Sequence, residues 1–387
     1  MYMRTLGKFI LAILLSSIWI LLPNLNTPHL IEYVPPFFKE VEKPPIEELI
    51  LESMTLEQKV GQLFIMGFYG TTLSESTINW IEDRYVGGVL ILGRNVQNEK
   101  QLKALTESIQ SHSYLPLIIS IDQEGGVVSR LQWNTILTTP QKSMDTPKEA
   151  YEIAVQRGRI LKNLGINTNL APVVENITDT NSFMYNRVFR GTSKEIAQKG
   201  ESAIYGYREV GIIAVPKHYP GHSNSSPDSH FYLPKVNITN QEWDSFIYPF
   251  KYLIERDCVD IIMAGHILYP NIDNNVSTIS NEILQQRLRD ELHFDGVILS
   301  DDMEMKAIKN QGDIKELAKK SLLAGIDLLI YSKETEELKE IYQYILESYR
   351  DESLDTEILN QKVLRILKLK EKYGMLDSFT PQLPQEE

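Results

Sequence analysis

The chain has 387 residues, a formal net charge of −13 and an isoelectric point near 5.2. This acidic balance disfavours a nucleic-acid partner, because the phosphate backbone would repel the protein. The single cysteine, Cys258, excludes an intramolecular disulfide framework and a cysteine-rich zinc site.

The amino terminus has the pattern of a targeting segment. Arg4 and Lys8 precede an apolar run over residues 9–22, and the next charged residue is Glu32. We predict a signal sequence or membrane anchor at residues 1–23, the only part expected to contact a membrane. Because the basic residues come first, the rest of the chain is expected outside the cytoplasm, anchored or secreted. Residues 24–45 contain five prolines and are predicted to form an extended linker.

The globular body is predicted at residues 46–380 and begins with a helix over 46–62. Eight apolar, β-branched runs follow, separated by segments with helical spacing. Strands that are apolar on both faces and alternate with helices form parallel sheets, so eight such units predict a closed (β/α)8 TIM-type barrel. An open doubly wound sheet is the alternative, although the chain has no glycine-rich phosphate turn. The predicted strands are residues 63–68, 86–92, 115–122, 166–173, 212–218, 259–266, 295–302 and 326–332.

The longer predicted helices cover residues 148–164, 193–210, 279–292, 333–349 and 353–373, and a polar tail is expected at 381–387. Polar residues stand where several of the strands end. They are Asp122, Glu175, Lys217, His218, His266, Asp301 and Asp302. Barrel enzymes build their sites at this carboxyl-terminal face, so we expect these side chains to converge.

Two pairs at strand ends have both a chemical and a structural interpretation. One of Asp301 and Asp302 should face the barrel mouth as a nucleophile or base, or else cap the next helix. Asp122 can accept hydrogen bonds from sugar hydroxyls and Arg130 can bind a carboxylate, or the two merely shape a turn. The same alternatives hold for Arg187.

The segment 217–230, KHYPGHSNSSPDSH, carries three histidines in a loop shaped by proline and glycine. Lys217 and His218 suit hydrogen bonding to a polyhydroxylated ligand. His218, His222, Asp228 and His230 are an alternative metal-ligand set, although their spacing matches no helical zinc motif. A third hypothesis pairs Asp228 with His230, because a carboxylate beside an imidazole makes a general acid/base near neutral pH.

These motifs resemble those of a known family. KHYPGH followed by DSH is similar to the signature of glycoside hydrolase family 3, in its β-N-acetylglucosaminidase branch. The resemblance extends over MTLEQKVGQLF (54–64), DQEGG, NRVF, MAGHILYP and SDDMEM. It implies a (β/α)8 barrel and a retaining mechanism through a covalent glycosyl-enzyme. It also implies removal of terminal β-linked N-acetylglucosamine, typically from peptidoglycan fragments.

The resemblance also implies roles for individual residues. Asp301 corresponds to the nucleophile, His230 to the acid/base and Asp228 to the partner that tunes the imidazole. The residues implied to bind the sugar are Asp122, Arg130, Arg187, Lys217 and His218.

The predicted function is therefore that of an exo-β-N-acetylglucosaminidase of the bacterial cell envelope. It would act on N-acetylglucosamine-containing glycans and muropeptides without a cofactor or metal. The alternatives are a β-glucosidase or β-xylosidase, a glycoside phosphorylase on the same barrel, a metal-dependent hydrolase and an inactive, membrane-tethered glycan-binding module.

Overall fold

The computed structural model describes residues 44–224, 228, 229 and 231–379. The predicted targeting segment 1–23, almost all of the predicted linker 24–45, His230 and the predicted tail 381–387 lie outside these residues. Within the described ranges, no helix is both long enough and apolar enough to cross a membrane.

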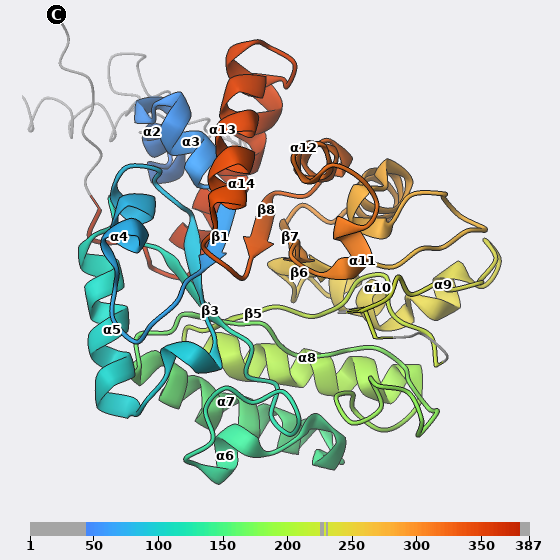
Figure 1. The fold of residues 1–387 in the computed structure, drawn as a ribbon. Helices are drawn as coiled ribbons and strands as arrows, with labels where there is room; N and C mark the ends of the chain where they lie inside the picture. The colour runs from blue at the N-terminus through green and yellow to red at the C-terminus, as the bar shows by residue number, and fades with distance from the viewer. Residues whose placement is uncertain (1–43, 225–227, 230, 380–387) are drawn as a thin grey trace, which may run out of the picture. The chain divides into compact units, whose positions relative to one another are not determined.

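Eight parallel strands form the centre of the fold, in the order β5-β4-β3-β2-β1-β8-β7-β6 (Figure 1). The two ends of this order meet, because Tyr219, beyond β5, bridges Ala264 of β6 and its N–H donates to Met263 O at 2.8 Å. The predicted (β/α)8 barrel is confirmed. Its strands are β1 (Phe64–Gly67), β2 (Gly88–Ile91), β3 (Ile118–Ile121), β4 (Thr168–Asn169), β5 (Ile213–Ala214), β6 (Ile261–Ala264), β7 (Val297–Asp302) and β8 (Leu328–Tyr331).

Each strand lies inside one of the eight predicted apolar runs. Every residue of β1, β2, β3, β6 and β8 is buried, since helices cover one face and the barrel interior covers the other. β4 and β5 are shorter than predicted because Pro172 and Pro216 lack the N–H that a ladder requires. Pairing resumes after both prolines in a single bridge between Val173 and Lys217, which carries Lys217 to the barrel mouth.

The helices pack around the barrel, and α7 and α8 lie side by side along one flank (Figure 1). Their close approach depends on Gly206, where an added Cβ would lie 2.6 Å from Tyr151 O and 2.9 Å from Ala154 Cβ. The helices of the outer layer are α4 (Glu75–Glu82), α5 (Glu99–Ser111), α7 (Pro147–Asn163), α8 (Ser193–Glu209), α10 (Tyr248–Glu255), η5 (Glu282–Glu291, π-helical), α12 (Ile314–Ala324), α13 (Glu336–Arg350) and α14 (Thr356–Lys372). Shorter turns in the connections are η2 (Gly93–Asn95), α6 (Thr135–Thr138), η3 (Gln141–Ser143), α9 (Trp243–Phe246), η4 (Ser277–Ile279) and α11 (Lys306–Lys309).

The prediction of one helix over residues 46–62 is wrong, because the structure has two. α2 (Ile46–Ser53) ends before Met54, whose backbone is extended, and α3 (Leu56–Gly61) starts anew. Thr55 caps α3 in a capping box: its hydroxyl accepts from Gln58 N and the Gln58 side chain accepts from Thr55 N. This reciprocal pairing satisfies two backbone donors at the new helix start, so the interruption has little energetic cost.

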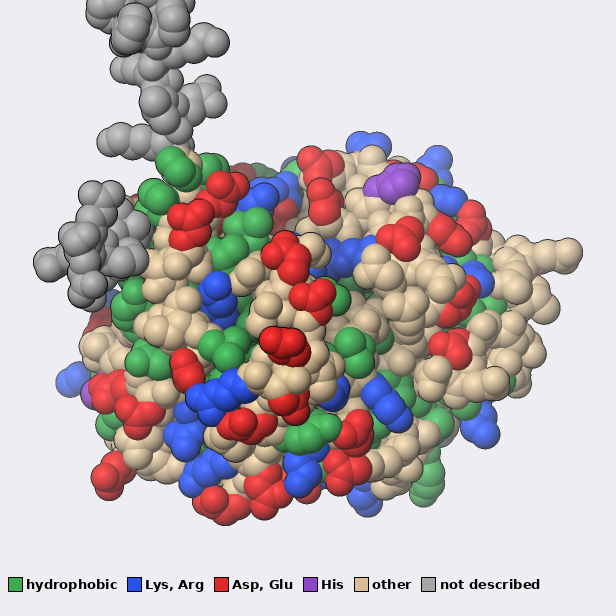
Figure 2. Space-filling model, turned by 90° about the horizontal axis from the view of Figure 1, so that it is seen from above, with side chains coloured by type: hydrophobic (Ala, Val, Ile, Leu, Met, Phe, Trp, Pro, Cys, Tyr) green, Lys and Arg blue, Asp and Glu red, His purple; other side chains and the backbone are tan. Residues whose placement is uncertain are grey.

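Charges of both signs are spread over the outside of the barrel. On the face in Figure 2, Lys and Arg side chains are interspersed with Asp and Glu side chains. A nucleic-acid site would need a continuous basic area. The absence of a nucleic-acid partner stays a prediction, and this face offers no observation against it.

A lysine without a charged partner is buried where the last helix meets the first part of the barrel. Lys370 of α14 is fully buried and donates from Nζ to Gln62 Oε1 at 2.7 Å. Burial lowers the pKa of Lys370 to about 7. In the unfolded chain a lysine has a pKa of about 10.4, so between these values the unfolded state binds more protons.

We therefore expect the protein to become more stable as the pH rises from about 7 towards 10. The Lys370 contribution has a slope of at most about 1.4 kcal/mol per pH unit. The Lys370→Met variant should lose this part of the pH dependence, whereas the Lys368→Met variant, at an exposed site of the same helix, should keep it. Urea unfolding at several pH values measures both. Identical pH dependence in wild type and Lys370→Met would contradict the assignment.

Candidate active site

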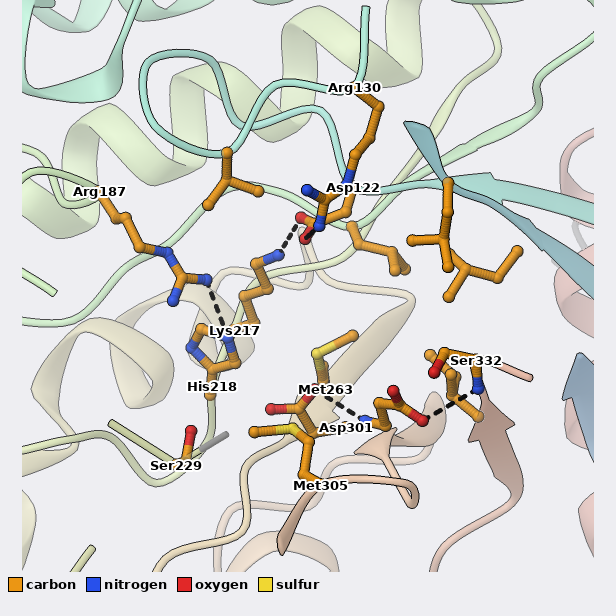
Figure 3. Close-up of a pocket in the computed structure, with 16 residues that line it drawn as sticks. Asp122, Arg130, Arg187, Lys217, His218, Ser229, Met263, Asp301, Met305 and Ser332 are labelled. Atoms are coloured by element: carbon orange, nitrogen blue, oxygen red, sulfur yellow. Dashed lines mark hydrogen bonds and ion pairs between the residues drawn. The ribbon is translucent and has the colours of Figure 1, made fainter. Parts of the chain in front are cut away.

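A pocket of about 130 Å³ opens at the carboxyl-terminal ends of the strands. Figure 3 shows the polar side chains that converge on it from several strands. Of the predicted site residues, Asp122, Arg130, Arg187, Lys217, His218 and Asp301 all line this pocket. The remaining lining residues are Leu90, Leu92, Val128, Leu170, Ser229, Met263, Asp302, Met305, Ile330 and Ser332.

An ion-pair network forms one wall of the pocket. Lys217 Nζ lies 2.5 Å from Asp122 Oδ1 and 2.7 Å from Glu124 Oε1. The guanidinium of Arg187 forms a two-point pair with Glu124, at 2.7 and 3.0 Å, and Arg130 Nη2 lies 3.1 Å from Asp122 Oδ2. Bidentate arginine–carboxylate pairs fix orientation as well as charge. The network therefore holds cationic side chains at defined positions around the pocket.

Glu124 is the fully buried centre of this network and is not among the predicted site residues. Burial alone would raise the pKa of Glu124, but the charges of Arg187 and Lys217 and their hydrogen bonds outweigh burial and hold the pKa well below its usual value. Glu124 is therefore ionised at any working pH. It compensates the buried charge of Arg187 and shares that of Lys217 with Asp122.

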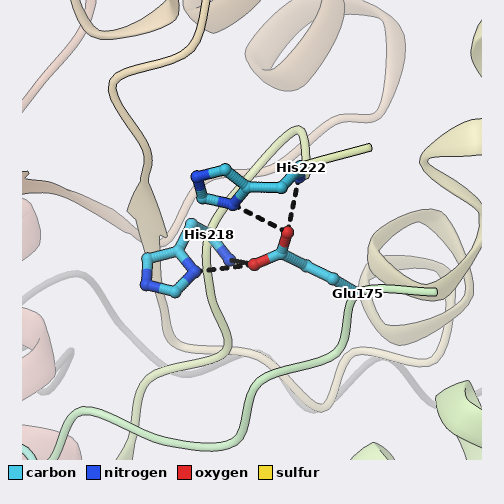
Figure 4. A group of neighbouring side chains, drawn as sticks. All are labelled: Glu175, His218 and His222. Atoms are coloured by element: carbon cyan, nitrogen blue, oxygen red, sulfur yellow. Dashed lines mark hydrogen bonds and ion pairs between the residues drawn. The ribbon is translucent and has the colours of Figure 1, made fainter. Parts of the chain in front are cut away.

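A second buried cluster joins Glu175 to His218 and His222 (Figure 4). Glu175 Oε1 lies 2.6 Å from His218 Nδ1, and Glu175 Oε2 lies 2.9 Å from His222 Nδ1. The backbone N–H groups of both histidines also donate to the carboxylate. One side chain thus fixes both ends of the KHYPGH segment. The Nδ1 of His218 is engaged with Glu175, which leaves its Nε2, 3.3 Å from Arg187 Nη2, on the pocket side.

This cluster is also the group of possible metal ligands found among residues 44–224, 228, 229 and 231–379. The metal-ligand set predicted from the sequence combines His218 and His222 with Asp228 and His230, whereas in the structure these two histidines contact Glu175. The carboxylate already accepts four hydrogen bonds from the two histidines, so the cluster is held together without an ion. The absence of a metal requirement stays a prediction.

The two aspartates at the end of β7 have different surroundings. Asp302 Oδ1 accepts from the backbone N–H groups of Glu304 and Ser332, both at 3.0 Å, so it braces the turn after the strand. Asp301 Oδ1 accepts from Asp302 N at 2.8 Å. Of the two, Asp301 has fewer bonds to the surrounding backbone and is the better placed to react with a ligand in the pocket.

Several groups stabilise the ionised form of Asp301. Burial would raise the pKa of Asp301, but the imidazoles of His218 and His266, the N–H of Asp302 and the ammonium of Lys217 outweigh burial and leave the pKa below its ordinary value. Burial in turn lowers the pKa of His266, which is fixed by Thr278 Oγ1 at 2.8 Å and by Asp302 O at 3.1 Å. A carboxylate that stays charged in a half-enclosed pocket is suited to nucleophilic attack.

The loop after β5 reaches the pocket at Ser229, which is buried in its lining. Asp228 stands one residue before it, and its carbonyl accepts from the N–H groups of Phe231 and Tyr232 at 3.1 and 3.0 Å. His230 lies outside the described residues, between Ser229 and Phe231. The residue directly before His230 in the chain, Ser229, therefore lies at the pocket.

The chain matches the model of the glycosyl hydrolase family 3 N-terminal domain over residues 55–369. It is 32% identical over 285 residues to a β-hexosaminidase of Methylobacillus flagellatus, covering 70% of this chain and 80% of that protein.

The chain is also similar to solved structures. A family 3 β-N-acetylglucosaminidase from Paenibacillus has a TM-score of 0.80 at 32% identity, covering 86% of this chain and 65% of that one. Zn-bound CbsA from Thermotoga neapolitana has a TM-score of 0.73 at 27% identity, covering 82% of this chain and 67% of that one. The predicted family is confirmed: the chain belongs to glycoside hydrolase family 3.

Proposed function

We propose that the protein is a retaining exo-β-N-acetylglucosaminidase. The observation that carries the proposal is the position of Asp301, which lines the same pocket as Asp122, Lys217 and His218. Ser229, next to His230 in the chain, lines it too. A carboxylate nucleophile and sugar-binding polar groups would then lie around one bound sugar. The similarity to β-hexosaminidases and β-N-acetylglucosaminidases supports this choice of sugar.

The proposed reaction has two displacements. A carboxylate oxygen of Asp301 bonds to the anomeric carbon as the bond to the leaving oxygen breaks, and protonated His230 gives its proton to that oxygen. Water then attacks the anomeric carbon while neutral His230 takes its proton, and the Asp301 carboxylate is released. The two inversions give net retention. Asp228 would favour the protonated imidazole needed in the first step.

The charge balance of the pocket favours a neutral sugar and an attacking water. Three cations, Arg130, Arg187 and Lys217, face four carboxylates, Asp122, Glu124, Asp301 and Asp302. A site for phosphate needs surplus positive charge or free donors, and here the cations are already paired. We therefore propose hydrolysis rather than phosphorolysis. A phosphorylase would be accelerated by phosphate and would yield a sugar 1-phosphate.

Trapping the covalent intermediate tests the proposal directly. Incubation with 5-fluoro-N-acetylglucosaminyl fluoride should add one sugar mass to the protein. The ring fluorine slows both steps, whereas the fluoride leaving group keeps the first step fast, so the covalent intermediate accumulates. Mass spectrometry of the digested protein should find the label on Asp301, and the Asp301→Asn variant should remain unlabelled. Turnover of an aryl N-acetylglucosaminide without any trapped adduct would exclude this nucleophile.

The sugar class is tested with aryl glycosides compared side by side. We expect the largest kcat/KM for the N-acetylglucosaminide over the glucoside and the xyloside. A larger kcat/KM for the glucoside or the xyloside would show that the proposed sugar is wrong. Tight binding of N-acetylglucosamine with no product from any glycoside would identify an inactive glycan-binding module.

We further propose an extracytoplasmic location in the bacterial envelope and peptidoglycan fragments as the natural substrates. The motivation is the basic-then-apolar pattern of residues 1–23 together with the proposed sugar specificity. Fusion of residues 1–45 to alkaline phosphatase, which is active only outside the cytoplasm, tests the location. An inactive fusion would count against it.

A further inference from the structure

Large exposed apolar side chains gather at the barrel mouth. Among the described residues, five of them lie in the loops after β1, β3 and β5: Tyr69, Val127, Trp133, Phe231 and Tyr232. Three lie on the outer helices, namely Tyr205, Leu323 and Ile358. Exposed apolar groups concentrated at the rim of a pocket mark a ligand surface. The surroundings of Tyr69 fix it in place.

The backbone on both sides of Tyr69 is tied down although its side chain is 56% exposed. Phe68 O accepts from Arg94 Nε at 2.9 Å and from Asn95 Nδ2 at 3.1 Å. Gly70 O accepts from the same Asn95 Nδ2 at 2.8 Å. The amide of a buried asparagine thus clamps the two carbonyls that flank the tyrosine, and the loop holds its exposed ring at a fixed site.

Arg94 connects this ring to the pocket. Its guanidinium lies 4.7 Å from the centroid of the Tyr69 ring, and its Nη2 donates to the carbonyl of Ser332, a residue of the pocket lining. The arginine therefore supports the ring as a cation–π partner and anchors it at the pocket rim. An aromatic ring that is already fixed loses little entropy when a ligand stacks on it.

We propose that Tyr69 is a stacking platform for the second sugar ring of the substrate, the one on the leaving-group side of the scissile bond. The inference rests on the proposed function. An exo-acting pocket encloses the terminal sugar, so the next ring lies at its rim, where an apolar C–H face of that ring can cover the tyrosine. Tyr69 would then determine the preference for oligosaccharides over glycosides with a small leaving group.

The test compares N,N′-diacetylchitobiose, which offers a second ring, with N-acetylglucosaminyl azide, which offers none. The Tyr69→Ala variant should lower the ratio of kcat/KM for the disaccharide to kcat/KM for the azide by about tenfold. Tyr69→Phe, which keeps the ring, should retain most of the ratio. Tyr205→Ala is the matched control, because Tyr205 on α8 is also exposed and also lies beside an arginine, 5.7 Å from Arg208.

If the ratio of the two kcat/KM values is the same in Tyr69→Ala as in the wild type, even where both values fall, the inference is overturned. If the wild type cleaves neither substrate, the proposed hydrolase activity fails instead. Calorimetry then tests separately whether Tyr69 contributes to the affinity for N,N′-diacetylchitobiose. We expect about tenfold weaker binding for Tyr69→Ala and no such loss for Tyr205→Ala.

Discussion

Replacing Asp301 with asparagine is expected to lower kcat/KM for an aryl N-acetylglucosaminide by a factor of about 10⁴ or more, as when a nucleophile is removed from other hydrolases. The amide has nearly the shape of the carboxylate and can still accept from Asp302 N, so the fold should survive. What it lacks is the charge that must attack the anomeric carbon. Steady-state kinetics, with circular dichroism to verify folding, measure the loss.

The neighbouring Asp302→Asn variant is the matched control. Asp302 accepts two backbone N–H bonds, from Glu304 and Ser332, so it acts as a brace for the turn. We expect its replacement to reduce stability by about 1 kcal/mol and kcat/KM by less than tenfold. The opposite ranking of the two variants would make Asp302 the nucleophile and reverse the assignment within the pair.

Asp301 should also keep the enzyme active in mild acid. The pKa of its carboxyl lies below the ordinary value, so the ionised form required for attack persists as the pH falls. Any acid limb of kcat/KM that appears well above pH 4 must then come from another group.

The barrel could be predicted from sequence because its strands are buried on both faces. This burial leaves continuous apolar runs, and the chain has eight of them in alternation with helical segments. Apolar spacing continues across Met54, so it does not indicate the break between α2 and α3. The T-L-E-Q sequence at residues 55–58 is a capping-box pattern and would have indicated the new helix start.

The buried acidic residues of the site are harder to infer. Glu124 meets Arg187 and Lys217, which are 63 and 93 positions further along the chain, and only the closed barrel brings them together. The sequence predicts Glu175 at a strand end, but its bonds to His218 and His222 depend on how the loop after β5 folds back. Sequence spacing identifies side chains that reach a barrel mouth, whereas the partners of each one depend on the packing of separate loops.

The Glu124→Gln variant is expected to be the most damaging change to the site scaffold. It removes the negative charge that pairs with Arg187 and Lys217 and leaves these nearly buried cations at least partly uncompensated. Breaking a buried ion pair by changing one partner costs about 3–5 kcal/mol of folding free energy. Freed from Glu124, the cations should also shift, so binding of N-acetylglucosamine should weaken.

Asp327→Asn separates these two effects. Asp327 precedes β8 at the opposite end of the barrel and is equally buried, with Arg289 at 2.6 Å and Arg365 at 2.8 Å. Its replacement should cost a similar free energy of unfolding while leaving sugar binding of the folded protein unchanged. Comparable loss of binding in both variants would mean that the Glu124 network serves stability alone.

The pH dependence gives an independent check on Glu124. Its folded pKa is depressed, so its contribution to stability is fully present above the unfolded value of about 4.3 and is lost as the pH falls towards the folded pKa. The stability difference between wild type and Glu124→Gln should therefore be constant from pH 5 to 7 and shrink below about pH 4. A difference that does not shrink in acid would contradict the assignment of this stability to the charge of Glu124, because glutamine keeps the shape of the side chain and removes only the charge.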